Sequence, residues 1–116
     1  MNKDLRVLST GERLWLWRRH RGLTILEAAA RFEVGKNRLG DLEREARDDW
    51  AFSGVGFEAD QVTASDLLRL ARRRSGIDLP AISNRLGVSR MTVLAWESTC
   101  DSRLVAFWRR RGFRNL

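Results

Sequence analysis

The chain of 116 residues lacks the motifs by which active sites are usually recognised. It has one histidine, His20, no glycine-rich phosphate loop and no spacing typical of metal ligands. His20 follows two arginines, and we interpret it as a surface residue at a helix end. We therefore expect that the protein is not an enzyme and has no cofactor and no metal.

Cysteine and long apolar runs are also scarce. The single cysteine, Cys100, excludes an internal disulfide and offers no zinc cluster, and a lone thiol without a paired base is usually inert. No apolar run approaches the length of a membrane span, and the first six residues lack the apolar segment of a signal peptide. These absences predict a cytoplasmic protein.

Acidic residues are few in the second half of the chain. Residues 1–63 carry eleven basic and eleven acidic side chains, whereas residues 64–116 carry eleven basic and four acidic ones, a net charge of +7. A basic half with clustered arginines is expected of a protein that binds a polyanion. Because the clusters Arg72–Arg74 and Arg109–Arg111 lie inside or beside compact helices, we expect nucleic acid and no membrane as the partner.

The stretch from Asp78 to Glu97 reads as a helix, a glycine turn and a second helix. Asp78 can cap the first helix, Pro80 fits its first turn, and Ser89 can cap the second helix. Gly87 stands where the chain needs a positive φ to reverse direction. The pattern favours a DNA-binding helix-turn-helix over an ordinary pair of core helices.

The side chains of this stretch divide into two faces. Packing positions hold Ile82, Leu86, Val88, Val93 and Trp96, and Ser83 is small where the two helices cross. The remaining residues of the second helix are expected to point outward or sideways, namely Arg90, Met91, Thr92, Leu94 and Ala95.

The same pattern occurs earlier in the chain. Sliding the sequence by 54 positions lays Gly11–Glu43 on Ser65–Glu97 without a gap. Identical residues then coincide, including Leu14 with Leu68, Arg18 with Arg72, Gly22 with Gly76, Val34 with Val88 and Glu43 with Glu97. The sequence predicts an all-α fold of two repeated helix-turn-helix units packed together, residues 1–63 and 64–116, with a C-terminal closing helix.

Other segments complete this prediction. The helix from Thr10 has Leu14 and Trp17 on one face and Leu16 at its edge. Trp15 lies on the opposite side, where it could contact another chain or pack under the N-terminal arm. Thr24 and Glu27 form a capping box for a helix from Ile25 to about Phe32.

Two further segments have an apolar pattern. Between the units, a short helix near residues 45–52 and a loop are expected, with aromatic residues filling the seam between the units. The closing helix, residues 103–111, has an apolar arc that packs internally or pairs two chains. A homodimer could therefore form through Trp15 or through the 103–111 helix.

Both units resemble the Cro/phage-repressor, or XRE-like, family of helix-turn-helix proteins. The resemblance covers residues 11–44 and 65–98; it is specific over Arg85–Arg90 and weaker over Arg31–Lys36. The family often has a glutamine that meets a phosphate at the start of the second helix, where this chain has Ile25 and Leu79. The first unit also has Glu33 where the turn glycine would stand, which strains the turn and places a negative charge near the DNA.

The resemblance implies which residues meet DNA. Base edges would be reached by Arg90, Met91 and Ala95 in the second unit, and by Lys36, Asn37 and Asp41 in the first. Arg90 suits guanine and Asn37 adenine, whereas Met91 and Ala95 could touch only apolar groups such as the thymine methyl. For Lys36 and Asn37, a solvated helix start is the alternative. The DNA backbone would be contacted by Ser89, Thr92, Arg38, Arg72, Arg73 and Arg85.

These observations predict a sequence-specific double-stranded-DNA-binding transcriptional regulator associated with the nucleoid. By analogy, its small size suits a phage or mobile genetic element, with RNA polymerase or a regulatory protein as a further partner. An architectural or recombination-directionality factor is an alternative. A protein-interaction adaptor, antiactivator or antitoxin-like, is another, and the neutral first unit with Glu33 favours it most.

Overall fold

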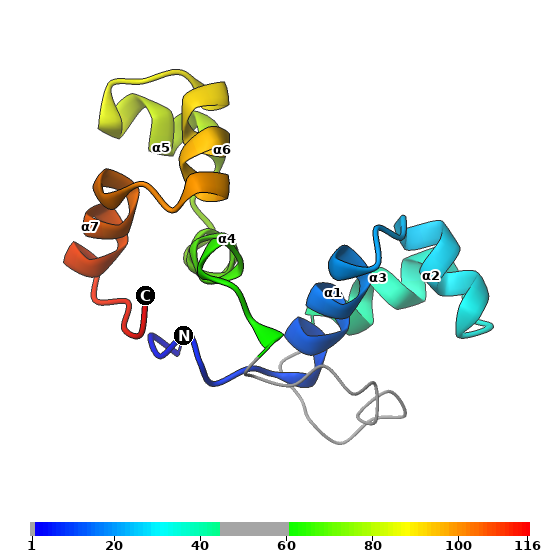
Figure 1. Cartoon of the computed structure of the whole chain (residues 1–116). Helices are drawn as coiled ribbons and strands as arrows, with labels where there is room; N and C mark the ends of the chain where they lie inside the picture. The colour runs from blue at the N-terminus through cyan, green and yellow to red at the C-terminus, as the bar shows by residue number, and fades with distance from the viewer. Residues whose placement is uncertain (1, 45–60) are drawn as a thin grey trace. The chain divides into compact units, whose positions relative to one another are not determined.

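The computed structural model describes residues 2–44 and 61–116, and this part of the chain is all-α, as predicted. No β-strand occurs among these residues, apart from one isolated bridge between Asp4 and Arg114. The predicted helix near 45–52 lies outside the described residues, as do the aromatic residues that were expected to fill the interface between the units. The helices (Figure 1) are α1 Thr10–His20, α2 Ile25–Arg31, α3 Lys36–Arg44, α4 Ala64–Ser75, α5 Leu79–Leu86, α6 Arg90–Thr99 and α7 Ser102–Arg110.

The chain divides into two compact units. The N-terminal unit is Leu8–Gln61, and the C-terminal unit joins Val62–Leu116 to the first residues of the chain, up to Val7. The N-terminal unit is thus an insertion between two segments of the C-terminal unit. The predicted packing of the two units against each other stays a prediction.

The helix starts agree with the 54-residue offset found in the sequence. Helices α4, α5 and α6 begin 54 residues after α1, α2 and α3 respectively. Ser9 and Thr63 stand at the same relative position, and each forms a capping box at the start of its helix. That the chain is a tandem repeat of one helical unit stays a prediction, because the agreement concerns helix positions and caps.

The caps read from the sequence are present. Thr24 and Glu27 form the capping box of α2, in which the Thr24 hydroxyl accepts from the Glu27 amide at 3.1 Å. The Asp78 carboxylate accepts from the Ala81 amide at 3.0 Å, and Pro80 lies in the first turn of α5. These local bonds satisfy amides that the helix itself leaves without partners.

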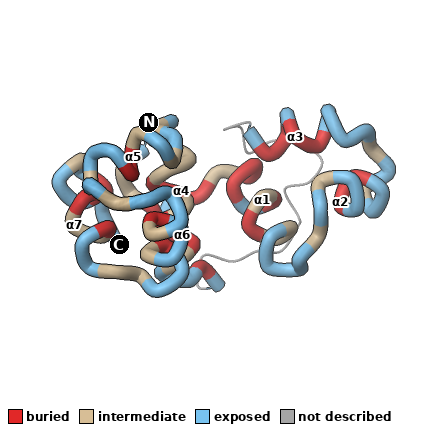
Figure 2. Tube along the Cα trace, turned by 90° about the horizontal axis from the view of Figure 1, so that it is seen from above, coloured by how far each residue is buried: buried red, intermediate tan, exposed pale blue. Residues whose placement is uncertain are grey.

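The core of the N-terminal unit lies between its three helices, as the burial colours show (Figure 2). The rings of Trp17 and Phe32 flank this core with their centroids 5.4 Å apart. Leu16, expected at the edge of the apolar face, is fully buried. Trp15 is half-buried, with the Arg19 guanidinium 5.3 Å from its ring centroid. The buried core residues are Leu14, Ala28, Ala29, Leu39 and Leu42.

The core of the C-terminal unit is built by α4, α5, α6 and α7. Trp108 is fully buried, with the rings of Phe107 and Phe113 packed edge-on at 4.9 and 5.6 Å. Leu104 and Phe107 are buried with it, so most of the apolar arc of the closing helix packs inside this unit. Of the two roles foreseen for that arc, the structure assigns it the internal one. The other buried residues include Leu67, Leu68, Leu70, Ile82 and Val93.

The N-terminal segment is an integral part of the C-terminal unit, whereas the predicted boundary placed all of residues 1–63 in the first unit. Leu5 is completely buried, and its amide donates to the Arg114 carbonyl at 3.3 Å. The Arg74 guanidinium donates to the carbonyls of Asn2 and Asp4 at 3.0 and 2.9 Å. The two ends of the chain therefore lie side by side (Figure 1).

We expect Leu5→Ala to destabilise the C-terminal unit by about 2–5 kcal/mol, because it leaves a cavity in that core. The matched control is Val7→Ala, since Val7 is 54% exposed and its truncation should change stability by no more than about 0.5 kcal/mol. Native-state hydrogen exchange of the α7 amides reports the unfolding free energy of this unit. Equal protection in the two variants would show that the N-terminal segment does not support the core.

Candidate nucleic-acid interface

Helix α6 separates a core face from an exposed face. Val93 and Glu97 are buried on one side. On the other, Met91 is 73% and Leu94 is 37% exposed, and Arg90 and Ala95 are exposed as well. The side chains expected to point outward are therefore accessible, and α6 offers them as one surface.

The turn before α6 fixes where this surface points. Gly87 has φ +68, and a Cβ added there would meet no atom within 4 Å, so the backbone conformation alone favours glycine. The Val88 amide donates to the Ser83 carbonyl at 3.1 Å, and Ser83 is buried as predicted for a close helix crossing. The Ser89 hydroxyl then accepts from the Thr92 amide at 3.1 Å and caps α6.

The corresponding turn of the N-terminal unit has the same shape with less suitable residues. Glu33 stands 54 positions before Gly87 and has φ +56, which costs a residue with a Cβ roughly 1–2 kcal/mol. Gly35 takes the place of Ser89; its carbonyl accepts from the Leu39 amide at 3.0 Å, but it has no side chain to cap α3. Helix α3 is therefore held less firmly at its start than α6.

We expect Glu33→Gly to raise the stability of the N-terminal unit by about 1 kcal/mol, because glycine adopts this left-handed conformation without strain. The matched variant Glu33→Gln removes the charge but keeps the Cβ, so it should leave the strain in place. Thermal unfolding followed by circular dichroism compares the two. An equal gain in both variants would assign the effect to charge and contradict the strain argument.

A buried ion pair ties α6 to α4. The Arg72 Nε and Nη2 atoms donate to the two Glu97 carboxylate oxygens at 2.8 and 3.2 Å, and Glu97 is 1% exposed. Arg18 and Glu43 form the same bidentate pair at 2.7 and 3.2 Å between α1 and α3. Arg72, expected at the DNA backbone, pairs with an internal carboxylate whose burial without a partner would be costly, and its contact with DNA stays a prediction.

The other residues expected at the DNA backbone remain on or near the surface. The Ser89 and Thr92 hydroxyls lie 2.9 Å apart at the start of α6, next to Arg90. Arg85 is exposed in the last turn of α5. In the other elements, Arg38 is exposed on α3 and Arg73 is half-buried on α4.

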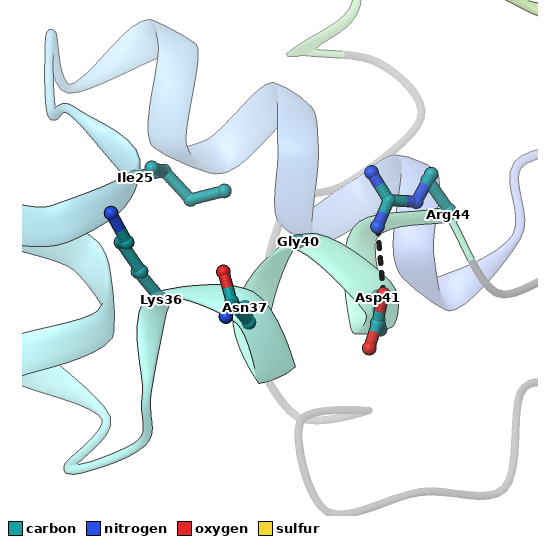
Figure 3. A pocket seen from close by; sticks show the side chains of 6 residues that line it. All are labelled: Ile25, Lys36, Asn37, Gly40, Asp41 and Arg44. Atoms are coloured by element: carbon teal, nitrogen blue, oxygen red, sulfur yellow. Dashed lines mark hydrogen bonds and ion pairs between the residues drawn. The ribbon is translucent and has the colours of Figure 1, made fainter.

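The base-facing candidates of the N-terminal unit gather at one shallow pocket of about 290 Å³ (Figure 3). Lys36, Asn37 and Asp41 line it from α3, together with Ile25 of α2. A Cβ added at Gly40 would make an ordinary van der Waals contact with the Ile25 Cδ1 atom at 3.4 Å. The sixth lining residue is Arg44, which the sequence analysis did not single out.

The charge of Asp41 is partly offset at this pocket. The Arg44 Nη2 atom donates to an Asp41 carboxylate oxygen at 2.7 Å, as the dashed line in Figure 3 shows. Both side chains are largely exposed, so the pair contributes little stability. It does lower the repulsion that Asp41 alone would exert on a phosphate.

All four acidic residues of the second half of the chain have internal partners. Glu97 pairs with Arg72, Asp78 caps α5, and Asp66 belongs to the Thr63 capping box. Asp101 accepts from the Arg103 Nε and Nη2 atoms at 2.9 Å each, and the Arg103 hydrogen bonds lower the pKa of Asp101 to about 2. Pairing does not remove these charges, so the positive field of this half of the chain comes from its excess of eleven basic over four acidic side chains.

Within residues 2–44 and 61–116, no group of three or more His, Cys, Asp or Glu side chains is placed to hold a metal ion. None of the described helices is long and apolar enough to cross a membrane. Comparison of the chain with protein-family models, with curated proteins and with solved structures finds no match. The candidate interface thus rests on the geometry of this chain.

We expect Arg72→Met to destabilise the C-terminal unit by about 3–5 kcal/mol, because it leaves Glu97 buried and unpaired. Arg85→Met, an exposed site, should change stability by no more than about 0.5 kcal/mol. Urea unfolding of both variants measures the difference. A stable Arg72→Met variant with weakened DNA binding would return Arg72 to the set of phosphate contacts.

Proposed function

We propose that the protein is a sequence-specific double-stranded-DNA-binding regulator of transcription and that α6 is its main recognition helix. The observation that carries the proposal is the exposed face of α6, set by a left-handed glycine turn and a serine cap. An α-helix fits the major groove of B-DNA, and Arg90, in the first turn of α6, can donate two hydrogen bonds to guanine. Met91 and Ala95 lie exposed on the same helix.

The electrostatics of the C-terminal unit support the same proposal. Its net charge is positive, so an approaching polyanion is attracted to it. The N-terminal end of α6 also carries the positive end of the helix dipole, beside Arg90. Exposed Arg85 extends this positive region to the end of α5.

The N-terminal unit has a secondary role in the proposal. Lys36 and Asn37 are exposed on α3 and can reach bases, but Asp41 lines the same pocket and Glu33 stands in the turn before α3. We assign this unit a weaker DNA contact. The adaptor alternative would give the same surface to a protein partner such as a regulatory protein or RNA polymerase.

The decisive experiment is selection of binding sites from a random duplex library with the whole chain, followed by footprinting of the selected site. Recovery of one sequence, with two protected patches, would support a regulator that uses both units. One patch would support the adaptor role for the N-terminal unit, and sharp bending of the bound DNA would favour the architectural factor. If no sequence is enriched, sequence-specific binding is wrong.

We expect Arg90→Ala to weaken binding to the selected site by roughly 1–3 kcal/mol and to relax the preference at one base pair, because it removes a bidentate contact. Lys36→Ala should cost less and act almost equally on the selected and a scrambled site. Fluorescence anisotropy on both duplexes measures these effects, after circular dichroism has verified that each variant is folded. The reverse ranking would make α3 the main recognition helix.

A further inference from the structure

Helix α6 carries apolar side chains on both of its sides. Val93 packs in the core, whereas Met91, Leu94 and Ala95 form a second apolar stripe at the i, i+3 and i+4 positions of the exposed face. The Met91 side chain is 73% exposed, and its contact with water gives no hydrophobic stabilisation. Three neighbouring apolar side chains on one exposed helix face are a candidate contact surface.

The hydroxyl groups of α6 are already engaged. Ser89 and Thr92 bond each other at 2.9 Å, while the Ser98 and Thr99 hydroxyls donate to the carbonyls of Leu94 and Ala95 at 3.3 and 3.0 Å. These bonds use three of the four hydroxyl hydrogens, and Arg90 is the strong side-chain donor of the exposed face. The chemistry available to a partner of α6 is therefore one guanidinium beside an apolar stripe.

Charge decides which partner suits this surface. A second copy of the chain would bring another positively charged unit against Arg90, and that approach is unfavourable. The major groove of duplex DNA instead presents apolar methyl groups at thymines between two rows of phosphates. This combination complements both the stripe and the charge.

We infer that α6 recognises DNA chiefly through the 5-methyl groups of thymines, with Arg90 as its one strong hydrogen-bonding reader, and this inference rests on the proposed function. Met91 is unbranched and flexible, so its side chain can fit against a methyl group from several angles. The selected site should contain a guanine for Arg90 next to a run of thymines for Met91, Leu94 and Ala95. Specificity in this half of the site comes from methyl burial.

The test uses the site recovered by selection and replaces its thymines, one at a time, with deoxyuridine. This change removes only the methyl group and keeps every hydrogen-bonding atom of the base pair. Each contacted methyl should account for about a three- to tenfold loss of affinity, the equivalent of one buried carbon. Deoxyuridine outside the footprint is the control and should have no effect.

A protein variant tests whether α6 is responsible for the loss of affinity in the deoxyuridine duplexes. Met91→Gln keeps the side-chain length but adds polar atoms, so the affinity ratio between thymine and deoxyuridine duplexes should fall towards one at a single position. The matched control is Val7→Thr, because Val7 is also an exposed apolar residue of the C-terminal unit and its change should leave the ratio unaltered. Both variants are compared with the unaltered chain.

The outcomes separate this inference from the function on which it rests. If selection recovers no site, the proposed function fails. If a site is recovered and every deoxyuridine duplex binds as tightly as the thymine duplex, the methyl inference is overturned while the DNA-binding function stands. If Met91→Gln leaves the ratio unchanged but alters the oligomeric state measured by sedimentation, the stripe binds a second copy and the inference is equally overturned.

Discussion

The exposed face of α6 depends on the ion pair between Arg72 and Glu97. A carboxylate as deeply buried as Glu97 is tolerated only with a partner, and the bidentate geometry allows the guanidinium little freedom. The pair joins the arginine-rich α4 to α6 and, with Val93 in the core, fixes the rotation of α6 about its axis. Because Glu97 and Val93 point inward, the side of α6 that carries Met91 must point outward.

The N-terminal unit has the same kind of ion pair, but the exposed face of its helix α3 is chemically different from that of α6. Arg18 and Glu43 hold α3 as Arg72 and Glu97 hold α6. The outer side of α3, however, presents Lys36, Asn37 and Asp41 around a pocket, where α6 presents an apolar stripe. The scaffold is therefore shared, and the two units differ in what they can recognise.

Local signals predicted most of the fold. The capping residues and Gly87 act over a few neighbours, so the sequence alone specifies their bonds and φ angles. The partner of Arg72 lies 25 residues away, and nothing in a run of arginines says which one turns inward. A signal did exist, because Arg18 with Glu43 and Arg72 with Glu97 have the same spacing under the 54-residue offset. Burial of Leu5 depends on contacts across the whole chain and has no local signature.

The connection between the two units gives the N-terminal unit, which has the weaker DNA contact, a role under the proposed function. The N-terminal unit is joined to the C-terminal unit at both of its ends, near Val7 and near Val62. Once α6 is bound, the effective concentration of the tethered unit at neighbouring DNA is high, on the order of millimolar for short linkers. Even a weak contact through Lys36 and Asn37 then adds to affinity. Because the two outer faces differ, a single chain of this kind would read an asymmetric site rather than a palindrome.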